Sequence, residues 1–185
     1  MNKINNYFYI VILISLYYLI LPTGYIELYR SIPVYPDNYK EIEIVRNYVK
    51  NRTKEDVSFF RLTNLHIVNA YKMVVNENID TLYKIAEELN PLCLFLKYFI
   101  NRRRPKQLDN KLNVLEHYGS ASTPSYPAGH AISAYFLSKK LIEKYPEKKT
   151  ILEELAYKCD IIRVKAGLHY PSDGKLSKII VDTFF

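Results

Sequence analysis

The sequence predicts an all-α protein, a single helical bundle domain of about six helices. Three observations support this fold class. Apolar residues recur at helical spacing through most of the chain after residue 37, and no stretch of useful length alternates as a half-buried strand does. The length of 185 residues leaves room for one domain. Apolar residues make up 49% of the chain and charged residues 24%, a balance typical of a globular protein with a core.

The first 24 residues are predicted to form a hydrophobic signal or anchor segment. Residues 7–21 are apolar and aromatic apart from Ser15, follow Lys3 and end before Pro22. No clean small-residue cleavage site follows, which favours an uncleaved membrane anchor over a removed signal. A buried helix of the domain is the alternative. Residues 25–36 are predicted to be a linker, and we expect the protein to be membrane-anchored or exported.

The folded domain is predicted to span residues 37–185 and to begin with two amphipathic helices. The first carries an apolar stripe made of Ile42, Ile44, Val45, Tyr48 and Val49. Thr53, followed by acidic residues at 55 and 56, is typical of an N-cap. The apolar positions after it stay in helical phase, so we expect one long helix from Thr53 to Tyr71.

The rest of the domain is expected to contain further helices on either side of a long loop. Asp80 should cap a helix that runs through Leu89, and Pro91 should break it before an apolar piece over 92–100. Residues 101–126 are polar and irregular, which indicates a loop. The last three helices are expected at 127–145, with Pro127 in the first turn, at 150–169 and at 172–185.

The charge of the chain indicates anionic partners. The formal net charge is +7, which favours phosphate esters, acidic lipid surfaces or nucleic acid. The short basic run Arg102-Arg103-Arg104 with Lys106 is of the kind that usually lies on a solvated face, and no nucleic-acid partner is expected. The mean hydropathy of −0.16 makes most of the chain too polar for a multi-span membrane protein.

The two cysteines, Cys93 and Cys159, exclude a disulfide scaffold and a cysteine-type zinc site. We expect them to be small core residues on neighbouring helices. A single disulfide between them is the alternative for an exported domain.

Three short clusters carry residues suited to phosphate chemistry. They are Lys97-x6-Arg104-Pro105, Pro127-Ala128-Gly129-His130 and Arg163-x5-His169-x3-Asp173. Lysine supplies a compact charge, and arginine supplies a planar fork for bidentate contact with phosphoryl oxygens. His130 at a helix start can protonate a leaving oxygen, and His169 backed by Asp173 can attack phosphorus.

Each cluster also has a structural alternative. Lys97 can be a helix-end lysine, and the segment before His130 can be a plain turn into a helix. His169 can be a core histidine. A His/Asp pair four residues apart can also be half of a metal site, but no third ligand is nearby in the sequence.

Together, the three ordered clusters resemble the type 2 phosphatidic acid phosphatase (PAP2) superfamily, which includes bacterial class A acid phosphatases and vanadium haloperoxidases. The superfamily signature is K-x6-RP, then P-S-G-H, then S-R-x5-H-x3-D. This chain reads KYFINRRRP at 97–105, PSYPAGH at 124–130 and IRVKAGLHYPSD at 162–173. The resemblance covers residues 36–185. Two positions depart from the signature, because Ala128 and Ile162 stand where it has serine.

The resemblance implies a role for each matching residue. The implied phosphate ligands are Lys97, Arg104, Arg163 and Gly129. His169 would be the nucleophile that forms a phosphohistidine, Asp173 would orient it, and His130 would be the general acid and then the general base. No metal or other cofactor is required in this mechanism, and vanadate belongs only to the haloperoxidase alternative.

The function predicted from these motifs is a metal-independent phosphoric monoester hydrolase, an acid or lipid phosphatase acting on phosphate esters. One alternative is a vanadium-dependent haloperoxidase, although the chain is shorter than those enzymes usually are. The other is a non-catalytic, membrane-tethered module that binds anions, against which the three intact clusters argue. The identity of the ester is expected to depend on the loop at 106–126.

Overall fold

The computed structural model describes residues 34–115 and 121–185, and all regular structure in these ranges is helical. The elements are α2 (Asn38–Lys50), α3 (Lys54–Thr63), α4 (Val68–Tyr71), α5 (Ile79–Glu87), α6 (Asn90–Ile100), α7 (Pro105–Leu108), α8 (Gly129–Lys144), the 3-10 helix η1 (Pro146–Lys148), α9 (Lys149–Lys165) and α10 (Pro171–Phe184). The all-α prediction is confirmed. The described residues hold more helices than expected, because some predicted helices are interrupted and short ones are added.

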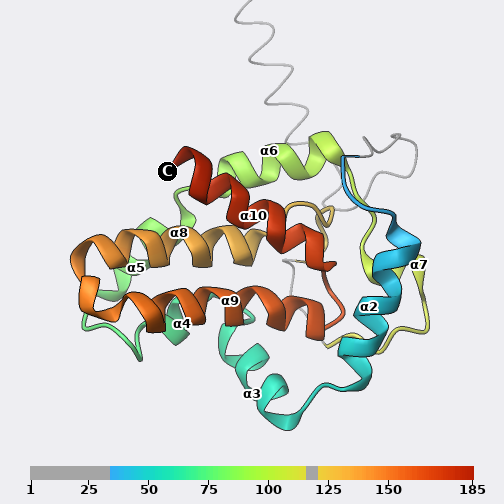
Figure 1. The fold of residues 1–185 in the computed structure, drawn as a ribbon, viewed down its shortest axis with the longest axis horizontal. Helices are drawn as coiled ribbons and strands as arrows, with labels where there is room; N and C mark the ends of the chain where they lie inside the picture. The colour runs from blue at the N-terminus through green and yellow to red at the C-terminus, as the bar shows by residue number, and fades with distance from the viewer. Residues whose placement is uncertain (1–33, 116–120) are drawn as a thin grey trace, which may run out of the picture.

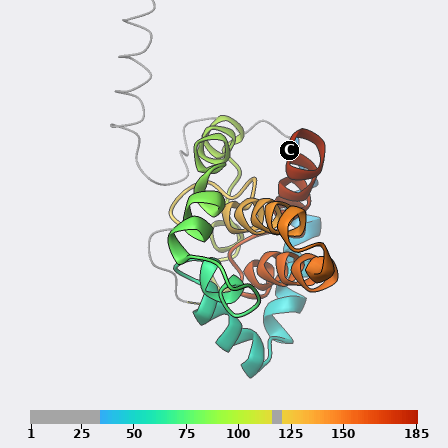
Figure 2. The ribbon, with the colours of Figure 1, turned by 90° about the vertical axis from the view of Figure 1, so that its left-hand side faces the viewer.

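The long helices α8 and α9 form the centre of the molecule. They run antiparallel through the tight turn at η1, and α10 packs along α8 (Figure 1). Helix α5 covers another side of α8, while α2 and α3 pack on α9 (Figure 2). The largest core cluster lies between these layers and includes Tyr71, Leu82, Leu137, Leu141 and Leu152, all at most 2% exposed. Burial of these side chains provides the main driving force for the arrangement.

The single helix expected from Thr53 to Tyr71 is wrong. Its start is confirmed, because the Thr53 hydroxyl accepts from the Asp56 amide at 3.2 Å and the Asp56 carboxylate accepts from the Thr53 amide at 2.9 Å. However, α3 ends at Thr63 and α4 begins only at Val68. The Thr63 hydroxyl donates to the carbonyl of Phe59, a bond that competes with the helical ladder. The break leaves two backbone carbonyls, at 63 and 64, that bind site residues.

Two other helix starts differ from the prediction. The cap of α5 is Asn78, whose side chain accepts from the Asp80 amide at 2.7 Å, so Asp80 lies in the first turn. Helix α8 begins at Gly129, and Pro127 therefore precedes the helix instead of forming its first turn. The break at Pro91 is confirmed, with that proline in the first turn of α6.

The two cysteines are buried and free, so the alternative of a disulfide between them is wrong. Cys93 and Cys159 belong to different core clusters. The predicted anchor at 1–24 and most of the linker lie outside the described residues. Within the described part of the chain, no helix is long and apolar enough to cross a membrane.

Candidate active site

The segment between α9 and α10 is shaped by Gly167. Its φ of +79° is in the left-handed region, which glycine adopts without the penalty that other residues pay. The Gly167 amide donates to the Val164 carbonyl at 2.9 Å, and the Leu168 amide donates to the Arg163 carbonyl at 3.0 Å. This is a Schellman motif, and it ends α9 at Lys165. The expectation that the helix continues to His169 is therefore wrong.

The turn brings His169 against Asp173, which lies in the first turn of α10. His169 Nδ1 donates to Asp173 Oδ2 at 2.8 Å, and both side chains are buried. The same oxygen accepts from the Tyr170 amide at 3.0 Å and from the Ser125 hydroxyl. Because a carboxylate only accepts, the proton sits on Nδ1, and Nε2 carries the lone pair, which accepts from Arg104 Nη1 at 3.2 Å.

The surroundings keep Asp173 ionised and His169 neutral. Burial acts to raise the pKa of Asp173, but the hydrogen bond from His169 and the charge of Arg102 outweigh it and hold this pKa well below its usual range. Burial, aided by the nearby charge of Arg104, lowers the pKa of His169 to about 3. A neutral imidazole beside a carboxylate is the protonation state that a nucleophilic histidine needs.

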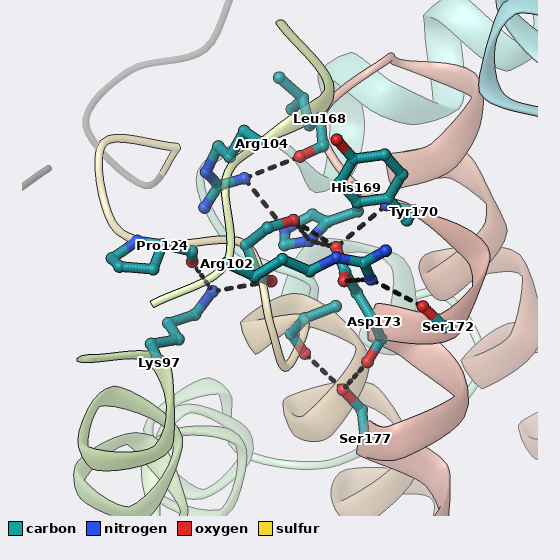
Figure 3. A network of polar contacts seen from close by, with 12 residues as sticks. Lys97, Arg102, Arg104, Pro124, Leu168, His169, Tyr170, Ser172, Asp173 and Ser177 are labelled. Carbon is teal, nitrogen blue, oxygen red and sulfur yellow. Dashed lines mark hydrogen bonds and ion pairs between the residues drawn. The ribbon is translucent and has the colours of Figure 1, made fainter. Parts of the chain in front are cut away.

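Lys97 and Arg104 reach the same place from the end of α6. Asn101, with φ of +54°, ends this helix in the left-handed conformation and sends the chain out toward Arg104. The Lys97 ammonium donates to the Pro124 carbonyl at 2.7 Å. Figure 3 shows Lys97 and Arg104 on the same side of His169, with Arg104 against its ring. The spacing of six residues therefore places a lysine and an arginine on one side of the imidazole.

Arg104 contacts His169 Nε2 directly. Its Nη1 lies 3.2 Å from His169 Nε2 and also donates to the Leu168 carbonyl at 2.9 Å. Its Nε donates to the Thr123 carbonyl at 2.7 Å. A group attached to phosphorus and attacked by Nε2 would therefore lie within reach of this guanidinium.

Arg163 is buried on α9, with 1% of the residue exposed. Its Nη2 donates to the Thr63 hydroxyl at 2.8 Å and to the Thr63 carbonyl at 2.5 Å. Among the described residues, its Nε and Nη1 have no hydrogen-bond partner. A buried, unpaired edge of a guanidinium is costly, and an anion is the group that would satisfy it.

The pKa values of Lys97, Arg104 and Arg163 are all lowered in the free site. Burial is the main cause in each case, lowering the pKa of Lys97 to about 8 and those of Arg104 and Arg163 to about 10. A bound anion would reverse these shifts, because it favours the charged forms.

His130 is in the first turn of α8, directly after Gly129. Its Nε2 lies 3.1 Å from the Asn64 carbonyl, which can only accept, so this nitrogen carries the proton. Nδ1 is then the nitrogen that gains and loses a proton. Burial and the charge of Arg163 hold the pKa of His130 well below its usual range. The N-terminus of this 16-residue helix also offers its first amides to an anion.

Most of these residues line one cavity of about 340 Å³. Five of the seven predicted site residues line it: Lys97, Arg104, Gly129, His130 and His169. Asp173 stands behind His169, away from the cavity wall. Arg163 is also outside the lining, although it is close enough to influence the pKa of His130.

Several residues of the site were missed by sequence reasoning. Arg102 was assigned to a solvated basic run, which is wrong, because it is fully buried and its guanidinium bonds Asp173. Ser125 and Thr123 lie in the predicted loop and contact Asp173 and Arg104, respectively. The spacing of Arg102 and Arg104 could have predicted the burial of Arg102. In an extended segment, alternate residues face the same way, so these two arginines point inward together.

The two departures from the signature are both buried. The Ala128 amide donates to the Asp173 carbonyl at 3.2 Å, so this position still contacts α10 through its backbone. Ile162 packs in a small apolar cluster with Phe60. Within the ranges 34–115 and 121–185, no three histidine, cysteine or carboxylate residues are grouped so that they could hold a metal ion.

Comparison with known proteins supports a fold assignment. No family profile matches the chain. No curated protein matches it either. Among solved structures, it is similar to the crystal structure of the first transmembrane PAP2 type phosphatidylglycerolphosphate phosphatase from Bacillus subtilis, with a TM-score of 0.53 and 20% identity over 78% of this chain and 82% of that one. At this identity the likeness shows a shared, PAP2-like helical fold.

Proposed function

We propose that this chain is a phosphatase of phosphate monoesters that works through a phosphohistidine on His169 Nε2. The observation that carries the proposal is the orientation of the His169–Asp173 pair. Its reactive nitrogen lies beside a cavity lined by Lys97 and Arg104, two cations whose pKa values are lowered by burial. Phosphoryl transfer needs an in-line nucleophile and positive charge around the equatorial oxygens, and we propose that His169 Nε2 and these two cations supply them.

In the proposed ground state, the cations hold the phosphoryl group. Lys97 and Arg104 bind its oxygens, and the first amides of α8, from Gly129 onward, bind another. The unpaired edge of Arg163, which lies behind the cavity lining, is proposed as the fourth contact. The dianion raises the pKa of His130, because a nearby negative charge favours the imidazolium.

In the first chemical step, His169 Nε2 attacks phosphorus and the bond from phosphorus to the ester oxygen breaks. His130 gives its Nδ1 proton to the departing oxygen, so the alcohol leaves neutral. Asp173 remains a carboxylate and stabilises the charge on the phosphorylated ring through the Nδ1 hydrogen bond. In the second step, His130 takes a proton from water, which attacks phosphorus and releases phosphate and free His169.

The substrate class and location are part of the same proposal. The similar structure belongs to a protein described as a phosphatidylglycerolphosphate phosphatase, which makes a lipid phosphate one reasonable ester. The net charge of +7 and the apolar stretch at 7–21 support work at an acidic membrane surface. No step in the mechanism uses a metal ion.

The test is phosphate release from p-nitrophenyl phosphate by the full chain in the presence of EDTA. The His169→Ala variant should lose release by at least about a thousandfold, the scale seen when a nucleophile is removed. Tyr157→Ala, on the exposed side of α9, is the control and should match wild type. Labelled substrate should leave an acid-labile, base-stable phosphoenzyme in wild type only. Release by His169→Ala within tenfold of wild type would refute the proposal.

A further inference from the structure

We infer that Arg102 is a positioning residue for the active site, holding Asp173 ionised and correctly turned behind His169, and that Glu41 of α2 holds Arg102 there. The inference rests on the proposed function for its kinetic consequences. Its structural basis is independent of that function, since it concerns contacts among buried residues.

The guanidinium of Arg102 is fully engaged with the protein. It is 0% exposed, and its Nη1 donates to Asp173 Oδ1 at 2.6 Å. All five N–H groups have an acceptor; the other four are Ser172 Oγ at 2.7 Å, Glu41 Oε2 at 2.6 Å, Asn38 Oδ1 at 2.9 Å and the Pro36 carbonyl at 3.5 Å. Arg102 therefore has no donor left for phosphate. In this it differs from Arg163, which keeps an unpaired edge.

Aromatic rings enclose the guanidinium and keep water from it. The carbon at its centre lies 4.0 Å from the ring centre of Tyr170, 4.4 Å from that of Tyr35 and 5.6 Å from that of Tyr126. These distances are those of cation–π contacts. A charge held by rings and by five hydrogen bonds has one orientation, so the carboxylate that it binds is fixed as well.

Glu41 ties both Arg102 and α10 to α2. One carboxylate oxygen binds the Arg102 guanidinium at 2.6 Å. The other accepts from the Ser172 amide at 3.0 Å, in the first turn of α10. A carboxylate at a helix N-terminus is favourable to the helix dipole. Because Asp173 follows Ser172 directly, Glu41 and Arg102 together fix the turn from which the active-site carboxylate projects. Figure 3 shows Arg102 against Ser172 and Asp173 at this turn.

The charge of Arg102 also sets the state of Asp173. Burial alone would favour the neutral carboxylic acid, and Arg102 is one of the groups that outweigh burial. If Arg102 becomes neutral, the pKa of Asp173 rises, and the acid form appears at a higher pH. A protonated Asp173 holds His169 Nδ1–H less firmly, so the nucleophile loses its orientation.

The test uses the full chain, because Tyr35 and Pro36 contact Arg102 and a shortened chain would alter the site. In Arg102→Met, kcat for p-nitrophenyl phosphate should fall by about 10–100-fold, the usual effect of removing a partner that orients a functional histidine. The acid limb of the kcat/KM profile should move to higher pH. In Arg102→Lys, which keeps the positive charge, the acid limb should lie closer to its wild-type pH than in Arg102→Met. Arg46→Met, at a half-exposed arginine on α2, is the matched control and should change neither.

A double variant separates positioning from stability. Glu41→Met with Arg102→Met removes both charges of the Glu41–Arg102 pair, so this double variant should melt at a higher temperature than Arg102→Met, which leaves Glu41 buried without its cation. Its kcat should stay as low as that of Arg102→Met. A double variant with wild-type kcat and an unmoved acid limb would overturn the inference.

Failure of the inference can be told from failure of the proposed function. If wild type releases no phosphate, or His169→Ala still does, the proposed function fails. The nitrogen-15 resonances of the His169 ring, assigned by their loss in His169→Ala, then decide the inference without turnover. Arg102→Met should shift the ring from a purely Nδ1-protonated form toward a mixture of tautomers, with Arg102→Lys between. Unchanged ring resonances in Arg102→Met would overturn the inference.

Discussion

Substitution of Asp173 by asparagine tests the geometry of the site most directly. The change keeps the shape of the side chain and removes its charge. Asp173 Oδ2 accepts from His169 and Tyr170, while Oδ1 accepts from Arg102. Every group that faces this carboxylate through these bonds is a donor. An asparagine must therefore point its NH₂ at donors, whichever way it is turned.

The expected loss of kcat in Asp173→Asn depends on which contact of the carboxylate is lost. With NH₂ toward His169, the ring must accept at Nδ1 and its proton moves to Nε2, which blocks the proposed nucleophile. In serine proteases, the comparable change of the orienting aspartate costs about 10⁴ in kcat. We expect a loss of about 10³–10⁴-fold here, or about 4–5.5 kcal/mol of activation free energy. Removal of one partner of a buried ion pair costs about 3–5 kcal/mol of stability, and the low end applies because Glu41 still pairs with Arg102.

The assay combines phosphate release with urea unfolding of the same preparation. Asp182→Asn is the control, since its pair with Lys178 is more than half exposed and worth at most about 1 kcal/mol. Circular dichroism must show that Asp173→Asn is folded under the assay conditions. A folded Asp173→Asn with kcat within tenfold of wild type would refute the assignment of a tautomer-fixing role to this carboxylate.

Two further predictions concern the turn and the cation site. Gly167→Ala should lower stability by about 1–2 kcal/mol for the left-handed backbone alone; the new Cβ would also lie 3.0 Å from Val114 Cγ1. Urea unfolding measures this, and an unchanged midpoint would contradict the Schellman assignment. The pKa of Lys97 near 8 in the free site implies that affinity for inorganic phosphate falls as pH rises above 8, because binding then requires uptake of a proton. Calorimetric titration from pH 7.5 to 10 on wild type and Lys97→Met checks this, and equal pH slopes in the two proteins would contradict it.

Local sequence signals gave the helical class and several helix ends correctly. The capping box at Thr53 and the helix start after Pro91 depend on residues a few positions apart, so they can be read from the chain directly. The end of α9 was also readable, because Gly167 is the residue type that a Schellman motif favours. The predicted helix end near His169 rested on Pro171, whereas Gly167 ends α9 at Lys165.

The break between α3 and α4 had no comparable local signal. The apolar phase continues through 64–67, and this segment carries no proline or glycine. The carbonyls at its start instead bind Arg163 and His130, which lie on α9 and α8. A helix that continued through Thr63 and Asn64 would use these carbonyls internally, so tertiary contacts with the site favour the break.

The sequence by itself determined which residue types are available to the site and the order in which they occur, since their spacing along the chain is visible without a fold. Only the tertiary structure decided what each charge faces. Arg102 and Arg104 are two residues apart, yet one binds carboxylates that lie 61 and 71 positions away and the other faces the cavity. A buried charge takes its role from its nearest partner, because desolvation makes that contact dominate its energy. That partner is supplied by helices far away in the chain, so the role of each arginine followed from packing.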